Sequence, residues 1–86
     1  MEVSFKPSFI RKFNSLTDEL RTETLEKIEL FKNTENHRRL RVHRLKGRLS
    51  NCYSFSVNYK FRIIFSYLSK NEAVLLAIGD HEVYEK

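Results

Sequence analysis

The chain has 86 residues, of which 41% are hydrophobic and 31% charged, with only two glycines and one proline. This length and composition predict one compact domain over residues 1–86 with a small core, and they argue against a deep active-site cavity, low complexity and disorder. The single cysteine excludes an intramolecular disulfide and a metal site built on two cysteines.

The formal charge of +5 is concentrated in one part of the sequence. Between Glu35 and Glu72 there are nine lysines and arginines and no acidic residue, whereas acids outnumber bases in the rest of the chain. A charge distribution of this kind attracts anionic partners, and nucleic acid is the commonest of these for a small basic protein. A basic face that is only solvated is the alternative interpretation.

The sequence predicts no leader segment and no membrane span. The first residues lack a basic stretch followed by an apolar run, and no apolar run approaches the roughly 20 residues of a membrane-spanning helix. We therefore expect a cytoplasmic protein that has no membrane partner.

The first part of the chain predicts a short strand and two helices. Residues 2–6 alternate weakly, as a strand does, and Pro7 suits the first turn of a helix. Apolar residues at helical spacing give a core-facing stripe to this helix and to a second one, which runs from the capping residue Thr17 to about Lys32. Residues 33–36 favour a turn.

From Leu40 onward the hydrophobic pattern changes to a period of two, which predicts four strands. They cover about residues 40–43, 52–57, 61–68 and 74–78, and the turns between them are short enough for antiparallel hairpins. The expected order is β-α-α-β-β-β-β. This is an α+β fold in which two N-terminal helices pack on one face of a mainly antiparallel sheet.

The helices can cover only one face of such a sheet, so we expect the other face to be open to water or to a partner. The alternation assigns Ser54, Ser56 and Arg62 to this open face. A rim of further polar residues is expected around it: Arg41, His43, Arg44, Lys46 and Arg48.

Three segments carry a family resemblance, namely HRLKG at 43–47, CYSFSVNYKFRIIF at 52–65 and AIGDHEVY at 77–84. In this order they resemble the RelE/ParE superfamily of type II toxin–antitoxin proteins, and the resemblance covers nearly the whole chain. It implies a RelE-like fold and a small basic toxin. Most members are ribonucleases that cut messenger RNA, and each is silenced by a co-expressed antitoxin.

The resemblance also implies a site of four residues. His43 corresponds to a histidine in the HxLxG segment of YafQ-like members, and His81 corresponds to the histidine of their terminal GxH. Arg62 stands where RelE-like members have a phosphate-binding arginine, and Tyr84 matches the tyrosine of their closing EVY.

The chain departs from both patterns on the third strand. RelE-like toxins have two lysines where this chain has Ser54 and Ser56, and the YafQ-like histidine and acid of that region are replaced by Ser56 and Lys60. Two hypotheses follow. Either a hybrid site works with the four residues named above, or the chain has lost hydrolysis and acts by binding, as the gyrase-directed ParE branch does.

RNA cleavage needs a base for the 2′-hydroxyl, an acid for the 5′-oxygen and positive charge for the phosphate, but no metal or other cofactor. We expect His81 to be the main proton-transfer residue and His43 a second acid–base group or a phosphate ligand. Arg62 would stabilise the transition state, and Tyr84 would stack on or orient a base. A zinc site of these histidines with His37 is a weaker alternative, because no carboxylates cluster with them.

Basic residues around this site can contact phosphates without reading sequence, which makes RNA affinity steeply salt-dependent. We expect them to bind messenger RNA and, on the ribosome, ribosomal RNA. The expected RNA-binding residues are Arg38, Arg39, Arg41, Arg44, Lys46, Arg48, Ser54, Ser56 and Lys60.

Each candidate also has a purely structural interpretation. His43 would be a polar strand residue bonded to backbone, Arg62 would pair with Glu82 or the terminal carboxylate, and Tyr84 would hold the tail to the sheet.

Three functions therefore stay open: an endoribonuclease toxin, a toxin that binds a protein such as gyrase, and a plain RNA-binding module. A toxin's positive face has to be masked in the producing cell, so we expect a cognate acidic antitoxin that folds on binding.

Overall fold

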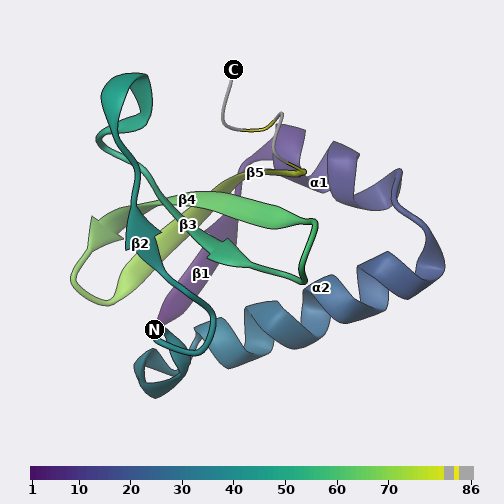
Figure 1. The fold of residues 1–86 in the computed structure, drawn as a ribbon, viewed down its shortest axis with the longest axis horizontal. Coiled ribbons are helices and arrows are strands. Elements are labelled where there is room, and N and C mark those ends of the chain that lie inside the picture. The colour runs from purple at the N-terminus through teal and green to yellow at the C-terminus, as the bar shows by residue number, and fades with distance from the viewer. Residues whose placement is uncertain (81–82, 84–86) are drawn as a thin grey trace.

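Within residues 1–80 and 83, the part of the chain that the computed structural model describes, two helices cover one face of a five-stranded sheet (Figure 1). In chain order the elements are β1 (Glu2–Phe5), α1 (Pro7–Asn14), α2 (Asp18–Phe31), the 3₁₀ helix η1 (Thr34–Asn36), β2 (His43–Arg44), the 3₁₀ helix η2 (Gly47–Leu49), β3 (Tyr53–Ser56), β4 (Arg62–Ser69) and β5 (Glu72–Gly79). The strands lie in the order β1-β5-β4-β3-β2. The pair β1 and β5 is parallel, and every other neighbouring pair is antiparallel.

This architecture confirms the predicted α+β fold and its order of elements. The first helix begins at Pro7, and the second begins directly after its N-cap Thr17, as the sequence predicts. Neither helix of the described chain combines the length and the apolar character that crossing a bilayer requires.

The strand predicted over residues 40–43 is wrong in its bounds, because β2 contains only His43 and Arg44. Arg41 adopts a positive φ of 59°, which is left-handed backbone and cannot continue a strand. The backbone before it turns instead, with the amide of Leu40 donating to the carbonyl of Asn36 at 3.0 Å. The edge of the sheet at β2 is therefore short and irregular.

The core between the helices and the sheet is built on aromatic rings. Phe31, the last residue of α2, stacks with Phe55 of β3 at a centroid distance of 4.4 Å and meets Phe65 of β4 edge-on at 4.7 Å. All three side chains are fully buried. Because burying an aromatic side chain contributes about 1.5–3 kcal/mol, this cluster is a major source of stability in a domain of this size.

His37 belongs to the same cluster. Its ring stacks with Phe31 at 4.7 Å and 8°, and its Nε2 lies 2.7 Å from the carbonyl oxygen of Phe31. A carbonyl can only accept, so Nε2 carries a proton and donates it. His37 thus fixes the segment between α2 and β2 and has a structural role.

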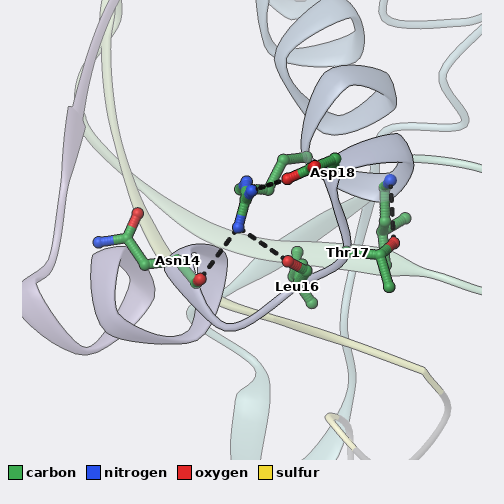
Figure 2. Close-up of polar contacts among 6 residues, drawn as sticks. Asn14, Leu16, Thr17 and Asp18 are labelled. Atoms are coloured by element: carbon green, nitrogen blue, oxygen red, sulfur yellow. Dashed lines mark hydrogen bonds and ion pairs between the residues drawn. The ribbon is translucent and has the colours of Figure 1, made fainter.

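The corner between α1 and α2 is held by one side chain. Arg21 donates through Nη1 to the carbonyls of Asn14 at 3.1 Å and Leu16 at 2.9 Å, and it pairs with Asp18 (Figure 2). The hydroxyl of Thr17 accepts a hydrogen bond from an amide in the first turn of α2, as expected of an N-cap. These contacts satisfy backbone groups that helix ends leave unpaired.

The face of the sheet opposite the helices is less open than expected. Ser54 is 0% exposed and Ile64 is 4% exposed, although both point away from the helices. The ring of His43 approaches Ser54 from the neighbouring strand, and Val83 lies close over Gly79. The expectation that Ser54 is displayed on an open face is therefore wrong, because alternation assigns a side chain to a face but does not show what covers that face.

The buried hydroxyl of Thr24 lowers the stability of the fold, and a substitution can remove it. Its side chain on α2 is 0% exposed, and its hydroxyl has no hydrogen-bond partner within the described chain. We expect Thr24→Val, which keeps the shape and deletes the hydroxyl, to raise the free energy of unfolding by about 1 kcal/mol in urea titrations. Thr22→Val on the exposed side of the same helix should change it by less than about 0.5 kcal/mol. A loss of stability in Thr24→Val would show that the hydroxyl is satisfied.

Candidate active site

Strand pairing brings four of the predicted site residues, His43, Ser54, Ser56 and Arg62, onto one face of the sheet. His43 pairs with Ser54, and Ser56 pairs with Arg62, which in turn pairs with Gly79. Ser54 and Ser56 are two residues apart on β3, so all of these side chains point to the face opposite the helices. Strand spacing and rise place the Cα atoms of His43 and Arg62 about 12 Å apart.

The ring of His43 is oriented by the backbone of Arg41. Nδ1 of His43 lies 2.8 Å from the carbonyl oxygen of Arg41, and Nε2 lies 3.5 Å from the hydroxyl of Ser54. Since the carbonyl can only accept, Nδ1 carries the proton in the neutral ring, and Nε2 has a free lone pair. At 3.5 Å the contact with Ser54 is too long to occupy this lone pair fully. His43 is therefore arranged as a proton acceptor.

Arg62 is partly engaged in holding the turn between β3 and β4. Its Nη1 donates to the carbonyl of Asn58 at 2.6 Å, that of Phe61 at 3.1 Å and that of Tyr59 at 3.2 Å. No partner within the described residues is recorded for Nε or Nη2. These nitrogens remain as donors that could meet a phosphate.

The same turn is fixed a second time by Asn58. Its Oδ1 accepts hydrogen bonds from the amides of Lys60 and Phe61, both at 2.8 Å, and its Nδ2 donates to Glu23 of α2 at 2.6 Å. The turn that precedes Arg62 is thus held by hydrogen bonds within it and tied to the helix layer. The sequence predicted a turn here but not this double role of Asn58, although an asparagine at the start of a turn is a known signal for bonding to nearby amides.

The predicted basic residues form an exposed rim along the β2 edge of the sheet. Arg38, Arg39 and Arg41 precede β2, Arg44 lies in β2, and Lys46 and Arg48 lie in the connection to β3. Arg44 pairs with Tyr53, so its side chain points to the helix side of the sheet, and the expectation that it borders the open face is wrong. Among the residues that the structure describes, none of these basic residues is in an ion pair. Their charge is therefore available to a partner. The exposed members are Arg38, Arg39, Arg41, Arg44, Lys46 and Arg48, with Lys60 exposed in the β3–β4 turn.

His81 and Tyr84 lie outside the described residues, so their roles stay predictions, and so does the alternative pairing of Arg62 with Glu82. The described chain leaves β5 at Gly79, which is the partner of Arg62. The chain that follows Gly79 therefore starts beside the strand position of Arg62.

The zinc alternative loses one of its three ligands, because Nε2 of His37 is bonded to the carbonyl of Phe31 and its ring is stacked on that of Phe31. Within residues 1–80 and 83, no three histidine, cysteine or acidic side chains group as metal ligands do.

Comparison with known proteins identifies the family. The family model for the RelE-like toxin of type II toxin–antitoxin system HigB matches residues 5–81. The chain belongs to this family of RelE-like toxins. Members of this type are generally mRNA interferases.

Solved structures of RelE-like toxins share the fold of the chain. A chain of the YoeB–YefM complex from Staphylococcus aureus matches with a TM-score of 0.72 and 14% identity, covering 94% of this chain and 97% of that one. YafQ from E. coli strain BL21(DE3) matches with a TM-score of 0.72 and 10% identity, covering 99% of this chain and 98% of that one. A chain of the archaeal RelE–RelB complex from Pyrococcus horikoshii OT3 matches with a TM-score of 0.71 and 16% identity, and the match covers 92% of each chain. No curated protein matches by sequence.

The geometry around Arg62 predicts a structural effect that is separate from any activity. Arg62→Ala should lower the free energy of unfolding by roughly 1–3 kcal/mol, because three carbonyls of the turn lose a charged donor. Lys60→Ala in the same turn should change it by less than about 0.5 kcal/mol, since its side chain is exposed. Equal small effects in urea unfolding would mean that Arg62 does not hold the turn.

Proposed function

We propose that this RelE-like toxin is a metal-independent endoribonuclease that cleaves messenger RNA. The observation that carries the proposal is the orientation of His43, whose Nδ1 is held by the Arg41 carbonyl while Nε2 lies on the face of the sheet that also presents Arg62. An imidazole with a fixed tautomer on the same face as a guanidinium with spare donors suits attack by a 2′-hydroxyl on a phosphate that lies between them.

The reaction uses only groups of the protein and the RNA. Nε2 of His43 takes the proton of the 2′-hydroxyl, and the 2′-oxygen then attacks the adjacent phosphorus. The bond from phosphorus to the 5′-oxygen breaks, and His81 protonates that oxygen as it leaves. Nε and Nη2 of Arg62 donate to the phosphate oxygens as negative charge builds up, and Tyr84 stacks on a neighbouring base.

The exposed rim would hold the RNA backbone. Its arginines and lysines contact phosphates of the messenger and of ribosomal RNA, so that cleavage takes place on the ribosome, in the cytoplasm. The absence of acidic residues between Glu35 and Glu72 supports this, because no neighbouring carboxylate in that stretch competes with phosphate for the rim.

A cognate acidic antitoxin is the proposed protein partner. Two of the similar structures are complexes of a toxin with its antitoxin, YoeB with YefM and RelE with RelB. For this chain the partner would place acidic side chains on the rim and thereby displace RNA.

One observation favours a second candidate, a toxin that binds a protein target such as gyrase. Nη1 of Arg62 is already bonded to the turn, and Ser54 and Ser56 stand where RelE-like toxins have lysines, so this site has fewer free cations for a phosphate than that pattern provides.

Mapping of transcript ends by primer extension after brief induction separates the two candidates. His43→Gln should lower the rate of cleavage by roughly 10² to 10⁴-fold, because a general base is lost. Arg11→Gln on the exposed side of α1 should cleave at the rate of the unchanged protein. Intact transcripts together with altered DNA supercoiling would contradict the nuclease proposal and support a toxin that binds gyrase.

The exposed rim predicts that the affinity for RNA depends measurably on salt concentration. RNA binding by the His43→Gln protein should weaken steeply with added salt, and Arg39→Gln should reduce the slope of log K against log salt by about 0.7, the value for one phosphate contact on a single strand. Arg11→Gln makes the same change of charge in the helix layer and should leave the slope unaltered. Equal slopes in both variants would remove Arg39 from the RNA-binding surface.

A further inference from the structure

A pair of tyrosines forms an aromatic surface on the opposite side of the sheet from His43 and Arg62. The rings of Tyr53 on β3 and Tyr67 on β4 are 4.9 Å apart at 75°, and both pack against Phe65, at 5.6 and 5.2 Å. Phe65 is fully buried, whereas Tyr67 is 37% exposed. We call Tyr53 and Tyr67 the aromatic shelf.

The shelf begins where the cover of the helices ends. Phe31 at the end of α2 packs on Phe65, and Tyr67 lies two residues further along β4 towards the β4–β5 turn. In Figure 1 this turn lies on the side of the molecule away from α1. The shelf rings are therefore held by their neighbours while one of them meets solvent. A rigid, partly exposed ring loses little conformational freedom when a flat ligand stacks on it.

Positive charge borders the shelf on one side. Arg44 pairs with Tyr53 across β2 and β3 and so points to the same face of the sheet, and its Nε is bonded to the carbonyl of Ser50 at 2.8 Å. Lys46 and Arg48 are exposed in the following connection, which lies at the same end of the sheet as the β4–β5 turn. These are phosphate-binding side chains beside an aromatic surface.

We propose that the aromatic shelf binds an unpaired base of a single-stranded nucleic acid, with Arg44 contacting an adjacent phosphate. Stacking on aromatic side chains together with basic residues that follow the backbone is the general chemistry of such binding. The inference rests on the proposed function in that it supplies RNA as the partner. It adds a second contact, on the other face of the sheet from the cleavage site, by which the toxin would hold an RNA segment other than the scissile one.

The state of the tyrosine hydroxyl is compatible with this role. Burial, together with the neighbouring Tyr53, raises the pKa of Tyr67 above its ordinary value of 10.0. A phenol is neutral at working pH even at its ordinary pKa, so Tyr67 adds no negative charge to the shelf.

A tryptophan reporter tests the shelf directly, because the chain contains no tryptophan of its own. Tyr67→Trp should show quenched emission when the full chain is titrated with a short 2′-O-methyl oligonucleotide, which cannot be cleaved. The same oligonucleotide with abasic positions should bind through its phosphates without quenching. Leu25→Trp on α2, at a side chain that is 53% exposed, is the matched control and should not respond.

Affinity gives an independent measure. Tyr67→Ala should weaken binding of the oligonucleotide roughly 5- to 100-fold, the range for loss of one stacked base, and Tyr67→Phe should stay within about twofold. Thermal unfolding of both variants checks that the fold is kept. If Tyr67→Ala does not fold, the reporter titration alone decides.

The outcomes separate this proposal from the nuclease proposal. Binding that leaves Tyr67→Trp unquenched, or quenches it equally with the abasic strand, overturns the shelf while transcript cleavage stands. A reporter that responds only to an added antitoxin makes the shelf a protein surface and also overturns it. If transcripts stay uncut in cells while Tyr67→Trp is quenched by the oligonucleotide, the nuclease proposal is wrong and the proposal for the shelf stands. Absence of any oligonucleotide binding overturns the shelf, and the mapping of transcript ends then decides the nuclease proposal by itself.

Discussion

The stacking of Phe31 against its neighbours is the interaction on which the rest of the structure depends. This ring joins the end of α2 to β3 and β4 through Phe55 and Phe65, and it joins the same point to the following segment through His37. The segment from His37 to Val42 is closed by a hydrogen bond of 2.9 Å between these two residues. Its course sets where the chain enters β2 and therefore where His43 stands.

Backbone carbonyls prepare the candidate site more than side chains do. The carbonyl of Arg41 selects the tautomer of His43, and three carbonyls of the β3–β4 turn hold Nη1 of Arg62. Preorganised groups of this kind need little rearrangement when charge develops on a bound phosphate. The cost is that Arg62 serves both the stability of the turn and the proposed chemistry, so the effects of its removal on folding and on cleavage have to be measured separately.

Much of the fold could be predicted from local patterns. The proline at the start of α1, the cap at Thr17 and the change of period after Leu40 are local signals, and they gave the correct order of elements. The resemblance to RelE-like toxins rested on three ordered segments, and the family match over residues 5–81 agrees with it.

Other features depend on tertiary contacts that no local pattern contains. The positive φ of Arg41 ends β2 early, and the core role of His37 appears only when the imidazole meets Phe31. The burial of Ser54 involves the ring of His43, which approaches it from the neighbouring strand. Alternation assigned Arg62 to the open face and His43 to its rim, whereas the register that joins them and the occupation of Nη1 by the turn come from the structure. The tail residues His81 and Tyr84 lie outside what the structure describes.

The parallel pairing of the first strand with the last has a consequence for the synthesis of this toxin. β1 is made first, yet its partners from Glu72 to Leu75 are made near the end of the chain. A nascent polypeptide that has not yet delivered β5 lacks the central connection between β1 and β4, and it cannot close the sheet. A fragment that ends before β5 therefore lacks the strand that joins β1 to β4, and the five-stranded order of the described sheet cannot form in it.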